Sequence, residues 1–168
     1  MLAILMKILK ALNSEQSPSQ LASAVSLAAI IGLTPLFSLH NAFVLLVVFW
    51  FRVNLSLFIV MWPIFSLFGL LLAPQAEALG LSLLQAPSLV PFWESFYNTL
   101  LGRWSNFYYG GVLGSLVIAL CMAIVLFPIS KVLITQYREK WLEKFEQFKV
   151  IRLLKTSKLW MIYQNHSS

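Results

Sequence analysis

The sequence contains no aspartate, so all six of its acidic residues are glutamates, and it has only two histidines. It also has a single cysteine, Cys121. One cysteine excludes an internal disulfide and a cysteine-based zinc cluster. With so few carboxylates and imidazoles, all of them scattered, no catalytic triad, carboxylate pair or metal cluster emerges. We therefore expect a non-enzymatic protein with no catalytic residues, no cofactor and no bound metal.

Charge is scarce along the whole chain. Charged residues make up 11% and hydrophobic residues 60% of the 168 residues, whereas soluble domains average about 25% charged and about 45–50% apolar. The composition predicts a membrane protein. Most of the formal net charge of +6 lies from Lys131 onward, where there are eight basic and three acidic residues. Topology and anionic lipid explain a basic tail beside an apolar span, so we expect no nucleic-acid partner.

Two long uncharged runs predict transmembrane helices, at residues 55–73 and 110–129. Each has about the twenty residues that a span needs. The second run begins with small residues, and small side chains let helices approach closely in lipid. The predicted packing face consists of Gly110, Gly111, Gly114 and Ser115.

The apolar segment 18–51 differs because it is interrupted. Ser17 and Gln20 around Pro18 are typical of a capped helix start. Gly32 and Pro35 predict a break, since proline removes a donor and restricts the residue before it. Each arm has about fourteen residues, or about 21 Å, which is short of the length of a span.

Topology decides how this segment is interpreted. The positive-inside rule places the basic residues of both ends in the cytoplasm, which requires an even number of crossings. Since 55–73 and 110–129 supply two, segment 18–51 is predicted to be a re-entrant hairpin. It enters from the cytoplasmic side, turns at Gly32 and Pro35, and returns. Residues 74–109 then lie on the outer face. A single kinked crossing by 18–51 stays open as the alternative.

Amphipathic patterns mark both ends of the chain. Residues 1–12 carry leucines at helical spacing and predict an interfacial helix. Residues 131–163 carry aromatic and apolar side chains at helical spacing, with basic residues mostly off that stripe, and predict a cytoplasmic amphipathic helix. The predicted fold class is an all-α integral membrane protein of one membrane domain, 1–168. It combines the re-entrant helical hairpin, two transmembrane helices and amphipathic interfacial helices at both termini.

Polar side chains accompany the predicted hairpin. Irregular backbone at membrane depth is tolerated only when it is buried in protein or faces a water-filled cavity. These side chains therefore either satisfy backbone groups freed by the break or line a polar notch for a lipid headgroup or another polar solute. Arg52 either anchors the helix end or holds a lipid phosphate. The candidate residues are Thr34, Ser38, His40, Asn41, Arg52 and Asn54.

Several short motifs carry a resemblance: Ser17-Pro18-x-x-x-Ala22, Gly32-Leu33-x-Pro35, His40-Asn41, Arg52-x-Asn54 and Pro63. Over about residues 15–75 the chain resembles an uncharacterised family of small bacterial inner-membrane proteins with a G-x-x-P…R-x-N…N-P pattern. It departs at Trp62, where the family tends to have asparagine. The resemblance implies a multi-pass protein of the Gram-negative inner membrane, with relatives linked to envelope and lipid-trafficking functions.

Three functions follow as expectations. The first is a non-enzymatic inner-membrane component that handles phospholipid, by letting it pass or by handing it to an envelope partner. The second is a structural scaffold in a membrane complex, and the third is an oligomeric small-solute channel or transporter. The expected partners are membrane phospholipids, together with another membrane or periplasmic protein or further copies of the chain.

Overall fold

The computed structural model describes residues 7–8, 11–12, 14, 16–51 and 53–141. Within this part of the chain the regular structure is helical and contains no strand. The elements are α2 (Pro18–Leu33), α3 (Leu39–Trp50), α4 (Leu55–Gln85), α5 (Val90–Tyr97), α6 (Leu100–Ser105), α7 (Gly110–Gln136) and a π-helical turn, η1 (Tyr137–Trp141).

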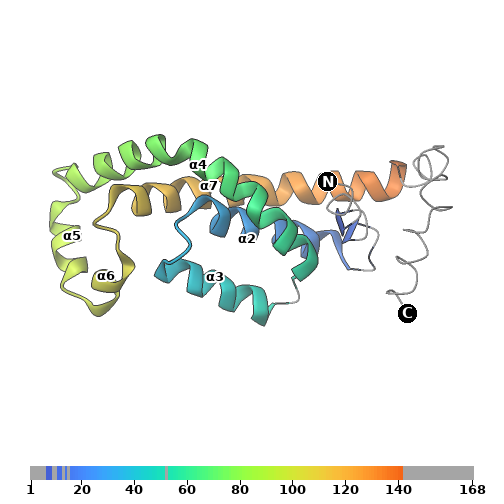
Figure 1. The fold of residues 1–168 in the computed structure, drawn as a ribbon, viewed down its shortest axis with the longest axis horizontal. Coiled ribbons are helices and arrows are strands. Elements are labelled where there is room, and N and C mark those ends of the chain that lie inside the picture. The colour runs from blue at the N-terminus through green and yellow to red at the C-terminus, as the bar shows by residue number, and fades with distance from the viewer. Residues whose placement is uncertain (1–6, 9–10, 13, 15, 52, 142–168) are drawn as a thin grey trace.

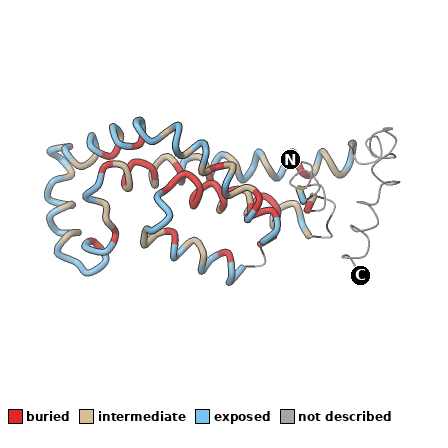
Figure 2. The backbone as a smooth tube through the Cα atoms, viewed as in Figure 1, coloured by how far each residue is buried: buried red, intermediate tan, exposed pale blue. Residues whose placement is uncertain are grey.

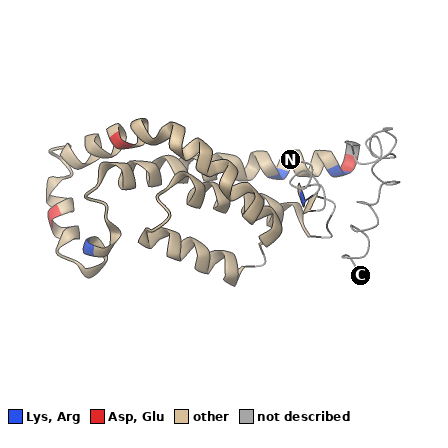
Figure 3. Cartoon of the chain, in the orientation of Figure 1, with Lys and Arg blue, Asp and Glu red and all other residues tan. Residues whose placement is uncertain are grey.

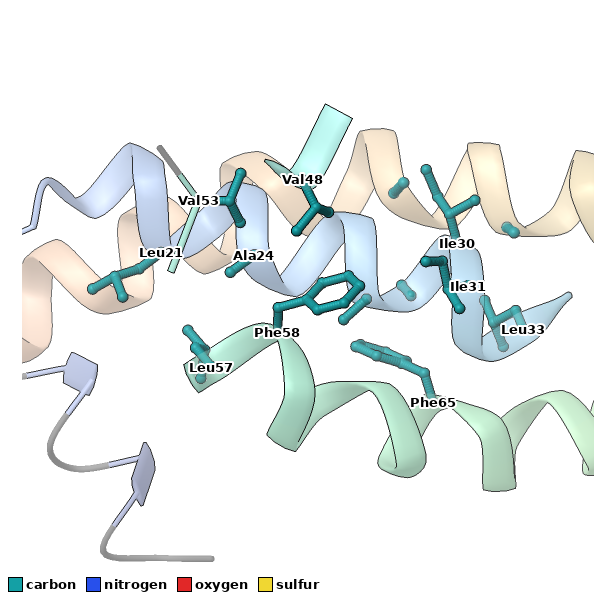
Figure 4. Close-up of a cluster of buried hydrophobic side chains, with 14 of the residues drawn as sticks. Leu21, Ala24, Ile30, Ile31, Leu33, Val48, Val53, Leu57, Phe58 and Phe65 are labelled. Atoms are coloured by element: carbon teal, nitrogen blue, oxygen red, sulfur yellow. The ribbon is translucent and has the colours of Figure 1, made fainter. Parts of the chain in front are cut away.

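Three helices form the body of the molecule. α4 and α7 run in opposite directions, and α2 packs against both of them along the direction of α4 (Figure 1). The core lies between α2 and its neighbours, where Leu21 and Ile31 of α2 are almost fully buried. Phe58 and Phe65 of α4 point toward α2 in this core (Figure 4). The buried residues accordingly follow the middle of the bundle (Figure 2).

The start and the interior of α2 follow from its residues. Ser17 Oγ accepts from the backbone N–H of Gln20 at 3.3 Å, and the Gln20 Oε1 atom accepts from the Ser17 N–H at 2.9 Å. This is the predicted capping box, with Pro18 at the first helical position. Four buried alanines let α2 lie close to two helices at once, because small side chains permit close approach: Ala22, Ala24, Ala28 and Ala29.

Helix α4 is longer than expected. It has 31 residues, or about 46 Å at 1.5 Å per residue. The predicted span ended at Ala73, before Pro74, but the helix continues through Pro63 and Pro74 to Gln85. Each proline removes one intrahelical hydrogen bond, which an apolar helix packed against neighbours tolerates. Residues 74–85 therefore continue α4.

Helix α7 also continues beyond its predicted end. It passes through Pro128 and Ile129 and runs to Gln136, where η1 follows directly. The expected cytoplasmic helix at 131–163 does not begin as a separate element at Lys131, and its residues from 142 onward lie outside the described residues. Most of the expected N-terminal helix at 1–12 also lies outside the described residues.

Helices α2 and α3 form a fold-back. After Leu33 the chain turns, and α3 runs back toward the end of the molecule at which α2 begins (Figure 1). α3 stands away from the bundle, and only Asn41 and Val48 of this helix are buried. Its outer surface exposes large apolar side chains, among them Phe49 and Trp50.

The opposite end is closed by α5 and α6 and by a cluster of aromatic rings. Trp93 Nε1 donates to the Leu83 carbonyl at 3.0 Å, and Phe96 stacks on Phe107 with ring centroids 5.9 Å apart. Burial raises the pKa of the Tyr97 hydroxyl. The cluster ties the short helices to the end of α4 and to the loop before α7.

Two helices are long and apolar enough to cross a membrane, at Leu55–Gln85 and Gly110–Glu139. Of the most apolar 18-residue stretch in each, only 22% and 28% is buried inside the protein. Large exposed apolar surface is unfavourable in water. The described charged side chains lie toward the two ends of the molecule and leave its middle uncharged (Figure 3). These features indicate a membrane protein.

Candidate functional site

The turn between α2 and α3 is held by two buried polar side chains. Thr34 Oγ1 lies 2.8 Å from the Ile30 carbonyl oxygen and 3.0 Å from Asn41 Oδ1. Asn41 Nδ2 donates to the Pro35 carbonyl at 2.9 Å and to the Leu36 carbonyl at 3.4 Å. Thr34 and Asn41 therefore satisfy carbonyl groups that the break in the helix leaves free, which is the structural role that the sequence left open for them.

Ser38 and His40 form a second pair at the turn. Ser38 Oγ donates to the Pro35 carbonyl at 2.8 Å and lies 2.9 Å from His40 Nε2. Because the hydroxyl proton is used on Pro35, His40 donates through Nε2–H, and its Nδ1 atom is left as an acceptor. This Nδ1 atom is buried without a partner in the described structure, and the ring lies 6.1 Å from that of Phe107.

Asn54 lies far from this turn. It caps α4 by accepting from the Leu57 N–H at 2.7 Å, and its Nδ2 donates to Gln16 Oε1 at 2.6 Å. The turn follows the C-terminal end of α2, whereas Asn54 contacts the chain just before α2 begins. The five described residues of the predicted notch thus do not meet at one place. Arg52, also predicted there, lies outside the described residues.

Near Asn54, an arginine holds the chain segment before α2. Arg138 donates through Nε to the Leu12 carbonyl at 2.8 Å, through Nη2 to Ser14 at 2.9 Å and through Nη1 to Gln16 at 2.7 Å. We call Arg138 and these three carbonyls the latch. In the sequence Arg138 is one cation of a basic tail, and nothing local indicates this contact with the N-terminal region.

The predicted small-residue face of α7 packs within the chain. A Cβ atom added to Gly114 would collide with the Ala76 carbonyl oxygen, and one added to Gly80 would collide with the carbonyl of Gly110. Ala76 and Gly80 thus form a matching stripe on α4, which the spacing small-x-x-x-small in the sequence could have revealed. Ser115, also on this face, is buried and donates to the Val112 carbonyl at 3.1 Å.

Gly32 serves a helix crossing and not the turn itself. It lies in the last turn of α2, and no described glycine has a positive φ. A Cβ atom on Gly32 would lie 2.5 Å from Phe65 Cβ and 2.9 Å from the Ser66 nitrogen. Gly69 provides the reciprocal gap, since its Cβ would lie 2.7 Å from the Gly32 oxygen. The prediction that Gly32 makes the turn is therefore corrected, and the turn lies after it, at Pro35.

A cavity of about 450 Å³ lies beside this crossing, bounded by the turn after α2, α4 and α7. It exists because α2 has 16 residues while α4 has 31, so that three packed helices become two where α2 ends. The cavity brings predicted turn and packing residues together: Gly32, Thr34, Pro35, Gly111 and Ser115. Two further polar residues, which the sequence analysis did not select, line it as well: Ser66 and Glu77.

Glu77 is the charged residue among those described as lining the cavity. Its Oε1 and Oε2 atoms lie 2.9 and 2.8 Å from the positions that Cβ atoms would take on Gly110 and Gly111. The carboxylate thus rests against the first turn of α7, where unpaired N–H groups and the helix dipole favour negative charge. The absence of side chains at both glycines makes room for it.

The arrangement gives no sign of a metal centre in the described part of the chain, where no group of three or more His, Cys, Asp or Glu side chains gathers.

Neither the curated proteins nor the solved structures provide a match to the chain. The resemblance drawn from the short motifs is confirmed at the level of the family. Residues 3–142 match the family described as "Uncharacterized protein conserved in bacteria (DUF2062)", and the chain belongs to this family.

Proposed function

We propose that this protein is a non-enzymatic component of the bacterial inner membrane that lets a phospholipid headgroup move between α4 and α7. The observation that carries the proposal is the cavity, which places hydroxyls and one carboxylate between otherwise apolar helices. A polar headgroup without hydrogen-bond partners is strongly disfavoured in hydrocarbon. Polar groups inside the helical layer lower this barrier.

The proposed orientation puts both ends of the chain in the cytoplasm, with α4 and α7 as the two crossings. Lys131 lies in the last two turns of α7 and Arg138 in η1, which follows directly, and the positive-inside rule assigns this end to the cytoplasm. Measured from Asn54 at 1.5 Å per residue, Ser66 lies about 18 Å and Glu77 about 35 Å along α4. Since the hydrocarbon core is about 30 Å thick, the cavity extends from mid-bilayer to the outer surface. This position suits lipid hand-off to an envelope partner.

In this orientation the fold-back of α2 and α3 is a re-entrant hairpin. α3 has 12 residues, or about 18 Å, and is too short to cross alone. The turn at Pro35 then lies at the far end of α2, about 24 Å from its start, and forms part of the cavity wall. Short apolar arms thin the local bilayer, which shortens the path that a headgroup must travel.

The scaffold alternative gathered partners through the basic tail, whose residues from 142 onward lie outside the described residues, and through the small-residue face of α7. That face is occupied by Ala76 and Gly80 of α4, so a partner cannot use it while the two helices are packed. We therefore keep the lipid proposal over a scaffold built on Gly110 and Gly114.

The test is lipid movement in liposomes that contain the purified protein. Ala73→Trp places a large side chain in the cavity, and we expect transbilayer movement of a labelled phospholipid to slow about tenfold, equivalent to about 1.4 kcal/mol in the barrier. Leu71→Trp is the matched control, because Leu71 is exposed on α4 and does not line the cavity. Equal rates for both variants and the parent protein would refute the proposal.

A further inference from the structure

We propose that the cavity selects lipids whose headgroup carries a primary ammonium group, as phosphatidylethanolamine does, and that Glu77 is the residue that recognises this group. The inference rests on the proposed function, because it names the class of lipid that the same cavity takes. It is carried by the hydrogen-bonding state of the polar side chains that line the cavity.

The hydroxyls of the cavity have no proton to offer a ligand. Ser66 Oγ donates to the Trp62 carbonyl at 3.2 Å, and Ser115 Oγ donates to the Val112 carbonyl at 3.1 Å. The single proton of Thr34 Oγ1 is used on the Ile30 carbonyl or on Asn41, at 2.8 and 3.0 Å. A hydroxyl has one donor and two acceptor sites. Each of the three therefore presents only oxygen lone pairs.

The charge of the cavity points the same way. Glu77 brings a carboxylate, which is an acceptor when ionised, and no lysine or arginine appears among the described lining residues. Arg103 is engaged elsewhere, with its Nε and Nη2 atoms 3.4 Å from the carbonyls of Tyr97 and Asn98. The lining side chains would thus offer an anionic group only acceptors and negative charge, whereas a cation with N–H donors would find an acceptor at each polar side chain.

A primary ammonium group fits these requirements best. It carries positive charge and three N–H donors, and a charge-assisted hydrogen bond to a carboxylate is roughly twice as strong as a neutral one. Choline is also a cation but has no N–H donor. A glycerol headgroup has hydroxyl donors but no positive charge. We therefore expect ethanolamine lipids to be favoured over both choline and glycerol lipids.

The ligand is a lipid and not a free amine, because most of the cavity wall is apolar. Leu33, Leu70 and Ile118 line it together with the polar groups. A soluble amine would leave this wall in contact with water, whereas the glycerol and first acyl carbons of a lipid would cover it.

The experiment measures which lipids stay bound to the full chain. The protein is placed in nanodiscs that hold equal amounts of ethanolamine, choline and glycerol phospholipids with the same acyl chains. It is then purified out of the nanodiscs, and the lipid that remains bound to it is identified by mass spectrometry. We expect about tenfold enrichment of the ethanolamine lipid. Glu77→Gln should abolish the enrichment, and Glu77→Asp should restore part of it. Glu94→Gln on α5, outside the cavity, should leave it unchanged. Soluble glycerophosphoethanolamine at the same concentration should not displace the lipid.

Three outcomes would overturn the inference: no enrichment in the parent protein, enrichment that survives Glu77→Gln, or displacement by the soluble amine. Thermal unfolding of each variant separates recognition from a purely structural role of Glu77 at the start of α7. A lower melting temperature with unchanged lipid preference assigns the structural role and refutes the inference. If Glu77→Gln does not fold, Ala73→Trp must abolish the enrichment instead. Lipid retention in this assay and lipid movement in liposomes are separate measurements. If Ala73→Trp slows lipid movement but the parent protein retains all three headgroups equally, the proposed function stands and only the headgroup inference is refuted.

Discussion

The two ends of α2 use polar residues in opposite ways. Before α2, donors and acceptors are matched: Arg138 gives three hydrogen bonds to three carbonyls, and Asn54 pairs with both Gln16 and Leu57. After α2, Thr34 and Asn41 close the turn, but the cavity beside it retains acceptors in excess of donors. The matched polar groups before α2 complete the fold, whereas the surplus of acceptors after α2 is the observation from which the lipid preference was inferred.

The largest expected effect comes from breaking the matched end. Arg138→Ala leaves three backbone carbonyls without their donor, and a hydrogen bond to a charged group contributes about 1.5–3 kcal/mol. We expect unfolding to become easier by about 3 kcal/mol or more, measured by thermal or denaturant unfolding in detergent. Arg138→Lys should recover little, since an ammonium group cannot reach three acceptors in the fixed geometry of a guanidinium.

The latch variant also sharpens the comparison. If the two ends are separate in function, Arg138→Ala at a temperature where it stays folded should keep the headgroup preference of the parent protein. A melting temperature equal to that of the parent protein would show that the latch does not contribute to stability.

A smaller effect is expected at the seam that bounds the cavity. Gly114→Ala forces a Cβ atom against the Ala76 carbonyl, and overpacking of this kind costs about 1–3 kcal/mol. Gly111→Ala is the matched control, because its Cβ would meet only the Glu77 carboxylate, at the end of a flexible side chain. Unfolding midpoints of the two variants should differ clearly, and equal midpoints would contradict close α4–α7 packing.

Cysteine substitutions for labelling should have the smallest effect on stability. They test directly whether segment 18–51 is a re-entrant hairpin or a kinked crossing. In a Cys121→Ser background, single cysteines replace Gln20, in the first turn of α2, and Trp50, the last residue of α3. Figure 1 shows that α3 runs back toward the end at which α2 begins. Both cysteines should react with a membrane-impermeant reagent from the cytoplasmic face, with little change in melting temperature. Reaction from opposite faces would make 18–51 a kinked crossing and remove the proposed hairpin.

Local features were predictable because they depend on neighbours in the chain. The capping box of Ser17 and Gln20 and the break at Pro35 needed only a few adjacent residues. The helices α4 and α7 extend beyond the predicted spans. Pro74 does not stop α4, because this helix is apolar and packed along its length, and the charge at Lys131 does not stop α7. Gly32 was misassigned because glycine serves both turns and close crossings, and only the position of α4 distinguishes them.

Long-range features were beyond sequence reasoning. The latch joins Arg138 to Leu12, 126 residues apart, and no periodicity encodes such a pair. The cavity was missed for a related reason. Its residues are individually ordinary, and their meeting depends on how three helices of unequal length are aligned.

That inequality of length has a consequence for the cavity. The depth of the cavity is set by the place in the chain where the proline falls, because helix α2 cannot extend past it. Moving Pro35 one turn later would add about 5.4 Å of helix and occupy the space from within. An insertion ahead of this proline would therefore make the cavity shallower, and a deletion would make it deeper, without any change in α4 or α7.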